Sequence, residues 1–190
     1  MAVTDAALIA AAQAGDRRAI DELFARYEQK IYRYGLRVCG DEESAREVLQ
    51  ETMLAAFRNL LGFRGHAALS TWLFQIARSF CIKERRGVRA MHALHADLTD
   101  DAPTPELHAR AREVGRALSS AIAQLPPDQR EVLMLRDVEG MSAQEAAVVV
   151  GIEVRALKSR LHRARAALRT TLAETDGLLG AGTDCAVRRE

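Results

Sequence analysis

The sequence predicts an all-α fold with two small helical domains joined by a flexible acidic linker. Apolar residues recur at three- and four-residue spacing, helix start and stop signals punctuate the chain, and aromatic residues make up only 5% of it. The 190 residues are 48% hydrophobic and 28% charged, as in ordinary globular proteins. Because no apolar run approaches the ~20 residues of a membrane span, we expect no stable membrane insertion and a cytoplasmic location.

Residues 1–88 form what we term the N-terminal block. Ile20, Leu23, Phe24 and later apolar residues at helical spacing predict a helix over 16–34. A capping box of Ser44 and Glu47 predicts that a second helix begins there and continues through residue 58. Glycines then mark a loop before a third helix over 71–86, whose end is basic.

Residues 89–106 change character, because acidic residues and two prolines replace the periodic apolar pattern, and we interpret them as a linker. Residues 107–174 form the C-terminal block, and Thr104 followed by Pro105 signals a helix start at the linker's end. Pro126 and Pro127 separate this helix from one over 128–138. We expect residues 175–190 to form only a short tail.

The segment 142–169 has the pattern of a helix-turn-helix. Ser142 and Glu145 form a capping box, and Gly151 stands where the first helix must stop. The second helix keeps an apolar stripe through Leu157 and Leu161 while its other positions carry six positive charges and no negative one. Such a helix reads the major groove of DNA, and the alternative is a solvated basic face on an ordinary amphipathic helix.

Aromatic and cationic side chains alternate over the loop and helix of residues 63–86. Unpaired bases stack on aromatic rings while Arg and Lys hold phosphates, which predicts a second nucleic-acid module. Trp72 has two readings, as part of the core or as a base platform, and the core is favoured. The basic cluster at residues 83–89 is the better evidence.

The sequence predicts neither a metal site nor a cofactor. Cys39, Cys81 and Cys185 are widely separated, and we expect the first two to be core thiols and the third to be exposed. His92 and His95 are spaced to hold one edge of a metal, but a closed site needs about four ligands.

Nearly the whole chain resembles a known family. Residues 125–168, LPPDQREVLMLRDVEGMSAQEAAVVVGIEVRALKSRLHRARAAL, are similar to region 4 of bacterial extracytoplasmic-function sigma factors of the sigma-70 family. Residues 44–60, SAREVLQETMLAAFRNL, and 63–86, FRGHAALSTWLFQIARSFCIKERR, resemble region 2. Members of this family are not enzymes: they bind core RNA polymerase, direct it to promoters and help to open the duplex.

The resemblance implies roles for particular residues and partners. In the C-terminal block, the −35 element would be read by Arg155, Lys158, Ser159, Arg160, His162 and Arg163. In the N-terminal block, the −10 element would be held by Phe63, Arg64, Arg78, Ser79, Lys83 and Arg86. The β′ clamp helices of core polymerase would contact Glu47, Gln50, Glu51 and Leu54. The resemblance further implies contact with the polymerase β flap, a linker threaded toward the active-site cleft, and sequestration by an anti-sigma factor.

The chain also departs from the family pattern. Arg46 and Glu47 stand where the clamp-binding motif has an acidic residue and Asp, and Ser79 replaces a common Asn. Arg155 and Ala156 replace a Gly and a hydroxyl residue close to DNA, which predicts a different −35 preference. Further along the basic helix, we expect Arg165 and Arg169 to meet phosphates or solvent.

Two other classes of protein compete with this interpretation. A stand-alone repressor or activator would need only the helix-turn-helix, together with a dimer seam or ligand pocket that the sequence does not mark. An enzyme would need a phosphate loop, catalytic triad or metal site, and we find none of these motifs in the sequence.

Overall fold

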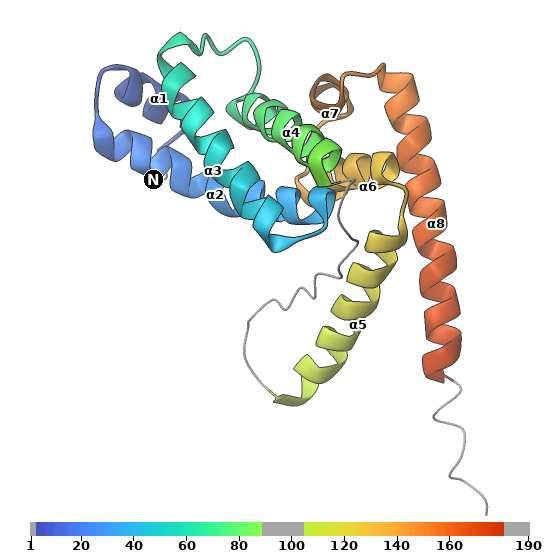
Figure 1. The fold of residues 1–190 in the computed structure, drawn as a ribbon. Helices are drawn as coiled ribbons and strands as arrows, with labels where there is room; N and C mark the ends of the chain where they lie inside the picture. The colour runs from blue at the N-terminus through green and yellow to red at the C-terminus, as the bar shows by residue number, and fades with distance from the viewer. Residues whose placement is uncertain (1–2, 89–104, 181–190) are drawn as a thin grey trace, which may run out of the picture.

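The structure, a computed structural model, describes residues 3–88 and 105–180, and within these ranges it contains helices and no strand (Figure 1). The N-terminal block consists of α1 (Asp5–Gln13), α2 (Arg17–Cys39), α3 (Glu42–Asn59), the short 3-10 helix η1 (Leu60–Gly62) and α4 (Leu69–Val88). The C-terminal block consists of α5 (Pro105–Gln124), α6 (Pro127–Leu133), the π-helical turn η2 (Met134–Val138), α7 (Ala143–Val150) and α8 (Val154–Gly180). The predicted all-α fold is therefore confirmed.

Helices α2, α3 and α4 enclose the core of the N-terminal block. Tyr34 and Phe74 are fully buried there and meet edge to face, with ring centroids 5.2 Å apart. Helices α2 and α3 cross closely at Gly35, where an added Cβ would lie 3.2 Å from the Cα of Ala45. A side chain at this position would force the two backbones slightly apart, so glycine favours the close crossing.

Helix α1 was missed by the sequence analysis, because its residues are almost uniformly apolar and show no clear polar face. Polar contacts at both of its ends attach it to the rest of the block. Asp5 pairs with Arg26 at 3.0 Å and accepts a hydrogen bond from the Tyr27 hydroxyl. The Gln13 amide donates to the carbonyl of Phe63 at 2.9 Å, which places α1 beneath the loop that follows η1.

The predicted start of α3 at a Ser44/Glu47 capping box was wrong. The cap is Asp41, whose extended backbone lets its carboxylate accept from the amide of Ser44 at 2.7 Å. Ser44 itself lies inside the helix and is buried. An Asp three residues before the amide it caps serves the helix as well as Ser does, and the chain adopts the earlier start.

The helix-turn-helix follows the predicted local signals. The side chain of Ser142 accepts from the Glu145 amide while the Glu145 carboxylate accepts from the Ser142 amide, so the capping box is present. Gly151 ends α7 with φ 70°, a left-handed conformation that costs other residues steric strain. The apolar stripe of α8 is buried at Leu157 and Leu161.

Two helices extend past the expected limits of the C-terminal block, one at each end. Helix α5 begins at Pro105, as the start signal predicts, so the helix includes the last residues of the expected linker. Helix α8 continues to Gly180, which extends it into the expected tail. None of the described helices is both long and apolar enough to cross a membrane.

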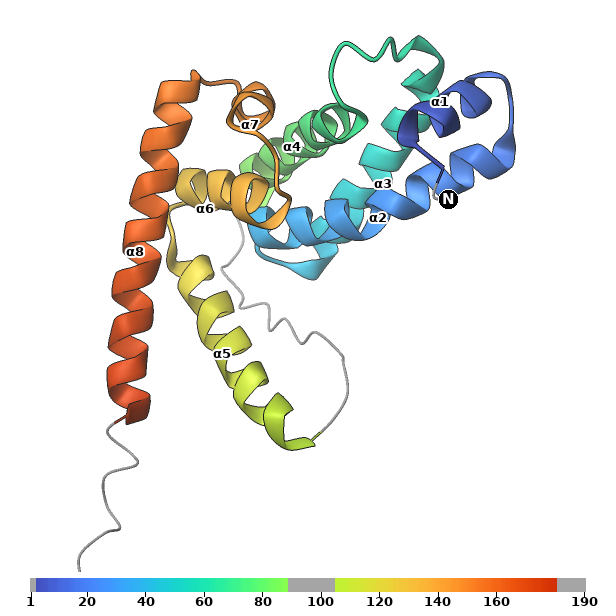
Figure 2. The same cartoon turned by 180° about the vertical axis from the view of Figure 1, so that it is seen from behind.

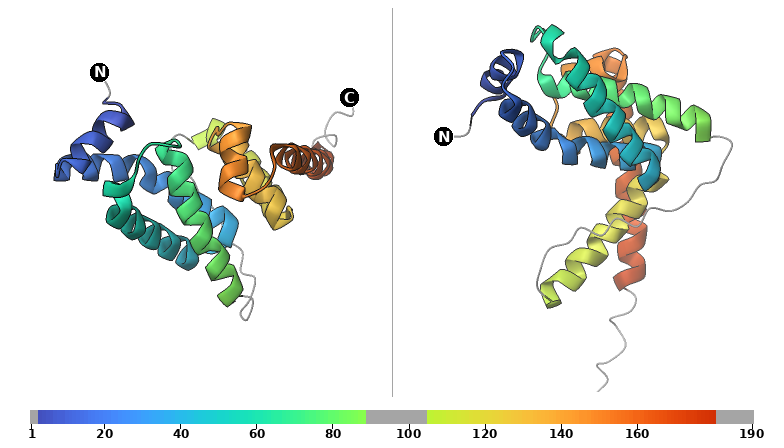
Figure 3. Two further views of the ribbon diagram at one scale, coloured as in Figure 1. Left: turned by 90° about the horizontal axis from the view of Figure 1, so that it is seen from above. Right: turned by 60° about the vertical axis from the view of Figure 1, so that its left-hand side comes forward.

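The two blocks pack against each other. Helix α7 lies beside α4, and α6 lies beside the C-terminal part of α2 (Figures 1 and 3). Helices α5 and α8 extend away from the N-terminal block on the side opposite α7, and Figure 2 shows them diverging toward their outer ends. Buried residues of both blocks form one hydrophobic cluster. We term this packed state the closed arrangement.

Candidate nucleic-acid and protein interfaces

The basic helix α8 presents most of its predicted DNA-reading residues on one open face. Its first turns lie directly after the Gly151 turn, at the edge of the molecule (Figure 2). Among the six predicted residues, five are exposed, namely Arg155, Lys158, Ser159, His162 and Arg163. Arg160 is half-buried instead, and its Nε lies 3.5 Å from Asp128 Oδ2 of α6. The open residues form a cationic surface that a major groove can accommodate.

Arg165, about two turns after Lys158 in α8, pairs with another residue of this chain. Its guanidinium binds both carboxylate oxygens of Asp137, at 2.9 and 2.5 Å, in the forked geometry of a strong ion pair. The hydrogen bond to Asp137 raises the pKa of Arg165. The sequence analysis considered only phosphate or solvent here, because spacing along α8 does not reveal that η2 lies beside it.

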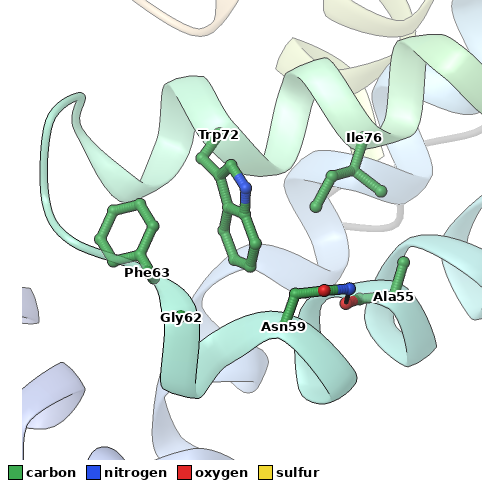
Figure 4. A pocket seen from close by; sticks show the side chains of 6 residues that line it. All are labelled: Ala55, Asn59, Gly62, Phe63, Trp72 and Ile76. Carbon is green, nitrogen blue, oxygen red and sulfur yellow. Dashed lines mark hydrogen bonds between the residues drawn. The ribbon is translucent and has the colours of Figure 1, made fainter.

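A pocket of about 350 Å³ opens between the end of α3 and the first turns of α4 (Figure 4). Phe63 and Trp72 form one wall, with ring centroids 5.0 Å apart and planes inclined at 42°. The pocket's polar side chain is Asn59, whose amide donates to the carbonyl of Ala55 at 2.7 Å. Both rings are half-buried, so they combine contact with the core and a surface open to a ligand.

The sequence predicted Phe63 and left Trp72 with two readings, and Asn59 was missed. These residues come from three consecutive elements, and only their folding onto one another creates the pocket (Figure 4). Arg64 follows Phe63 directly and is exposed. An open aromatic pocket with an adjacent cation has the composition of a site for an unpaired base and its phosphate.

The predicted DNA-binding residues of α4 do not all share one open face. Ser79 and Lys83 are exposed, one turn apart. Arg78 is directed toward α6, where its Nε donates to Glu131 Oε1 at 2.8 Å. Arg86 lies in α4, but its side chain is outside the part of the molecule that the structure describes.

Glu131 of α6 joins three helices, and the sequence analysis missed it. The same oxygen that binds Arg78 also accepts from the hydroxyl of Tyr34 in α2, at 2.8 Å. The Glu131 side chain is only 8% exposed, whereas that of Arg78 is 26% exposed. Burial, together with the negative charge of Glu131, raises the pKa of Tyr34 well above its ordinary value. The closed arrangement therefore contains a nearly buried charge pair between the blocks.

The four residues predicted to contact polymerase lie on the exposed side of α3. Glu47, Gln50, Glu51 and Leu54 are all exposed. Burial and the nearby negative charge of Glu47 raise the pKa of Glu84 in α4. Arg46, the departure from the family pattern, pairs with Glu42 at 2.6 Å on the same helix.

Two large apolar side chains extend this side of α3 and were missed. Phe57 is 56% exposed and Leu61 is 75% exposed. With Leu54 they recur at three- and four-residue spacing, a signal that the sequence contained but that is usually taken for a buried stripe. A group of exposed apolar residues rimmed by polar ones is typical of a protein-binding surface.

The residues that the structure describes include no group of three or more His, Cys, Asp or Glu side chains placed to hold a metal. His92 and His95, the candidate metal edge, lie outside those residues. Cys81 is buried as expected, whereas Cys39 is half-buried.

The fold and these surfaces define a helical DNA-binding protein with a helix-turn-helix in its C-terminal block. Two family descriptions match the chain: "Sigma-70 region 2" over residues 23–90 and "Sigma-70, region 4" over residues 115–168. The extracytoplasmic-function (ECF) sigma factor SigM of Mycobacterium tuberculosis is 36% identical over 87% of this chain and 83% of its own. The RNA polymerase sigma-H factor of Pseudomonas aeruginosa is 33% identical over 86% of this chain and 91% of its own.

Solved structures show the same similarity. CnrH, determined in complex with the cytosolic domain of CnrY, is 29% identical, covers 90% of this chain and 97% of its own, and superposes with a TM-score of 0.66. The sigma factor RpoE of Bartonella quintana, in complex with the anti-sigma factor NepR, shares the fold with a TM-score of 0.67 at 23% identity, over 80% of this chain and 96% of its own. This chain belongs to the sigma-70 family, and within it to the ECF sigma factors.

Proposed function

We propose that this chain binds core RNA polymerase and directs it to promoters by recognising −35 and −10 elements. The observation that supports the proposal is the presence of two differently built candidate nucleic-acid surfaces on one small sigma-family chain. One is the open basic face of α8, and the other is the aromatic pocket between α3 and α4. The first suits a duplex groove and the second suits an unpaired base.

The −35 element is assigned to the exposed residues at the start of α8. Arg155 and Lys158 lie in the first turns after Gly151, where a recognition helix meets base edges. His162 and Arg163 lie one to two turns further and complete the surface with Ser159. Arg160 joins this set only if its contact with Asp128 is exchanged for DNA.

The −10 element is assigned to the pocket and to the basic side of α4. A base unstacked from the non-template strand would stack against Phe63 and Trp72, while Asn59 offers a polar group beside them. Arg64, Ser79 and Lys83 are exposed and available to the sugar-phosphate backbone, and Arg86 is assigned to the same strand from its place in the sequence.

The polymerase β′ clamp helices are assigned to the exposed side of α3. Glu47, Gln50, Glu51 and Leu54 form the predicted part of this surface, and exposed Phe57 and Leu61 extend it. Aromatic residues are enriched among those that dominate binding energy at interfaces, which favours Phe57 as an anchor. The C-terminal block is assigned to the β flap.

Binding of −10 DNA would weaken the closed arrangement at Glu131. The Nε–H of Arg78 donates to Glu131, so a phosphate that takes this donor competes with Glu131 for it. An anti-sigma factor that holds the two blocks together would preserve this contact. The solved relatives determined with CnrY and with the anti-sigma factor NepR support an anti-sigma partner for this chain.

The domain boundaries are proposed as region 2 over residues 1–88, a linker over 89–106, region 4 over 107–174 and a tail over 175–190. The linker would thread toward the polymerase active-site cleft. We place the protein in the cytoplasm and propose that it is a specificity subunit without enzymatic activity of its own or any cofactor.

Reconstituted transcription tests the proposal. Purified core polymerase and this chain should produce specific transcripts from promoters that depend on the chain in vivo, and core polymerase alone should not. Specific DNA binding without core polymerase, together with no core-dependent transcript, would instead identify a stand-alone regulator.

A further inference from the structure

Two thiols from different helices lie close together in the N-terminal block. Cys39 and Cys81 are 42 residues apart in the sequence, yet their Sγ atoms lie 3.2 Å apart. Cys39 comes from α2 and Cys81 from α4, two helices that pack together. A disulfide bond is about 2.05 Å long, so the sulfurs need to approach by only about 1 Å.

The two cysteines differ in accessibility and in freedom to move. Cys81 is 1% exposed and lies within α4, on the side away from exposed Ser79 and Lys83. Cys39 is half-buried and is the last residue of α2. Gly40 follows it with φ 99°, so the backbone leaves the helix at this point. A small oxidant can therefore reach Cys39, and Cys39 can shift toward Cys81.

We propose that Cys39 and Cys81 form an oxidisable dithiol, which hydrogen peroxide converts to an intramolecular disulfide. The Cys39 thiolate attacks one peroxide oxygen, so that an S–O bond forms, the O–O bond breaks, and hydroxide leaves and becomes water with the thiol proton. The Cys81 thiolate then attacks the Cys39 sulfur, the S–S bond forms, and the S–O bond breaks to release hydroxide, which becomes a second water with the proton of the Cys81 thiol. One peroxide is reduced and two thiols are oxidised.

The disulfide would form beside the contact between the blocks. Two residues before Cys39, the carbonyl of Arg37 accepts from Arg130 of α6 at 3.2 Å. Cys81 lies within electrostatic range of Tyr34, which donates to Glu131. Oxidation would therefore link the end of α2 to the interior of α4, next to the residues that support the closed arrangement, and it would restrict the unfolded chain by closing a long loop.

The test uses the full reduced chain, treated with an equimolar amount of hydrogen peroxide and then alkylated. Peptide mass spectrometry without reductant should find Cys39 linked to Cys81 with the loss of two hydrogens, and dithiothreitol should reverse the link. The oxidised chain should melt at a higher temperature than the reduced one. Cys185→Ser is the matched control and should retain the link, whereas Cys39→Ser should lose it.

Several outcomes would overturn the proposal. They are sulfinic acid on Cys39 without a cross-link, a disulfide that joins two chains through Cys185, or an unchanged wild-type chain. The wild-type measurement needs no variant, so a folding defect of Cys39→Ser would leave the test intact. The proposal does not depend on the proposed function in transcription. Reconstituted transcription with the reduced chain tests that function separately.

Discussion

Replacing Glu131 with Gln should weaken the closed arrangement and strengthen binding to core polymerase. Gln keeps the shape and an acceptor oxygen for Tyr34 and Arg78 but loses the negative charge, so a weaker hydrogen bond replaces the ion pair with Arg78. A hydrogen bond to a charged group contributes about 1.5–3 kcal/mol. Because Arg78 is 26% exposed and can recover some hydration, we place the loss at the lower end, about 1.5 kcal/mol. Because 1.4 kcal/mol corresponds to a factor of ten in an equilibrium constant, the population of the closed arrangement relative to the open one should fall about tenfold.

The assay is the affinity of the chain for core polymerase, with solution scattering as a measure of compactness. If binding requires the open state, apparent affinity rises by up to the same tenfold factor, because the competent fraction increases. Asp137→Asn is the matched control, since it breaks the ion pair with Arg165 inside the C-terminal block. Equal affinities for the wild type and Glu131→Gln, or an equal gain in Asp137→Asn, would refute the reasoning.

Four further results are expected. Arg155→Ala should change the bases selected from a randomised −35 library and should lower the binding free energy by about 1–3 kcal/mol at the contacted position. Unchanged selection would show that Arg155 does not contact bases in the major groove. Trp72→Ala should weaken holoenzyme binding to a single-stranded −10 oligonucleotide by about 1–3 kcal/mol, Trp72→Phe should restore much of it, and equal loss in both would indicate a structural role. Phe57→Ala should reduce core affinity by more than about 1 kcal/mol without lowering the melting temperature, and full affinity would exclude this surface. Ser142→Ala should cost about 1 kcal/mol in the free energy of unfolding. Hydrogen bonds from Ser142 lower the pKa of Glu145 below its usual 4.5, so the stabilisation by this carboxylate is complete above that pH and is lost as pH falls through the lowered pKa. Denaturation curves at several pH values should therefore show that the free energy of unfolding falls less at acid pH in the variant than in the wild type.

Structural features that depend on residues close together in the sequence were predicted well. The Ser142 capping box, the Gly151 stop and the buried stripe of α8 are local features, and each is present in the structure. The start of α3 was misplaced because Asp41 and Ser44 are both good caps, and only the folded chain selects between them. Helix α1 was missed because periodicity is a weak signal in a short and almost uniformly apolar segment.

Contacts between distant residues could not be predicted in this way. Glu131 is separated by 53 residues from Arg78 and by 97 from Tyr34, and nothing in the periodicity of α6 marks it as a shared partner. The pocket likewise requires α3, η1 and α4 to fold together before Asn59 and Trp72 line one space. Residue type alone identified candidate DNA contacts, but it could not show that Arg78 already has a carboxylate partner.

The closed arrangement affects the two DNA surfaces unequally. The proposed reading face of α8 is open, so contact with a −35 element would not itself require the blocks to separate. Elements centred at −35 and −10 lie about 80 Å apart along a duplex, at 34–36 Å per helical turn. A segment as long as residues 89–104, fully extended, spans at most about 55 Å, and α8 is about 40 Å long. We expect separated blocks to cover that distance more readily than blocks held together at Glu131. We therefore expect occupation of both elements to favour the open state, in which Arg78 would be free of Glu131 and available to DNA.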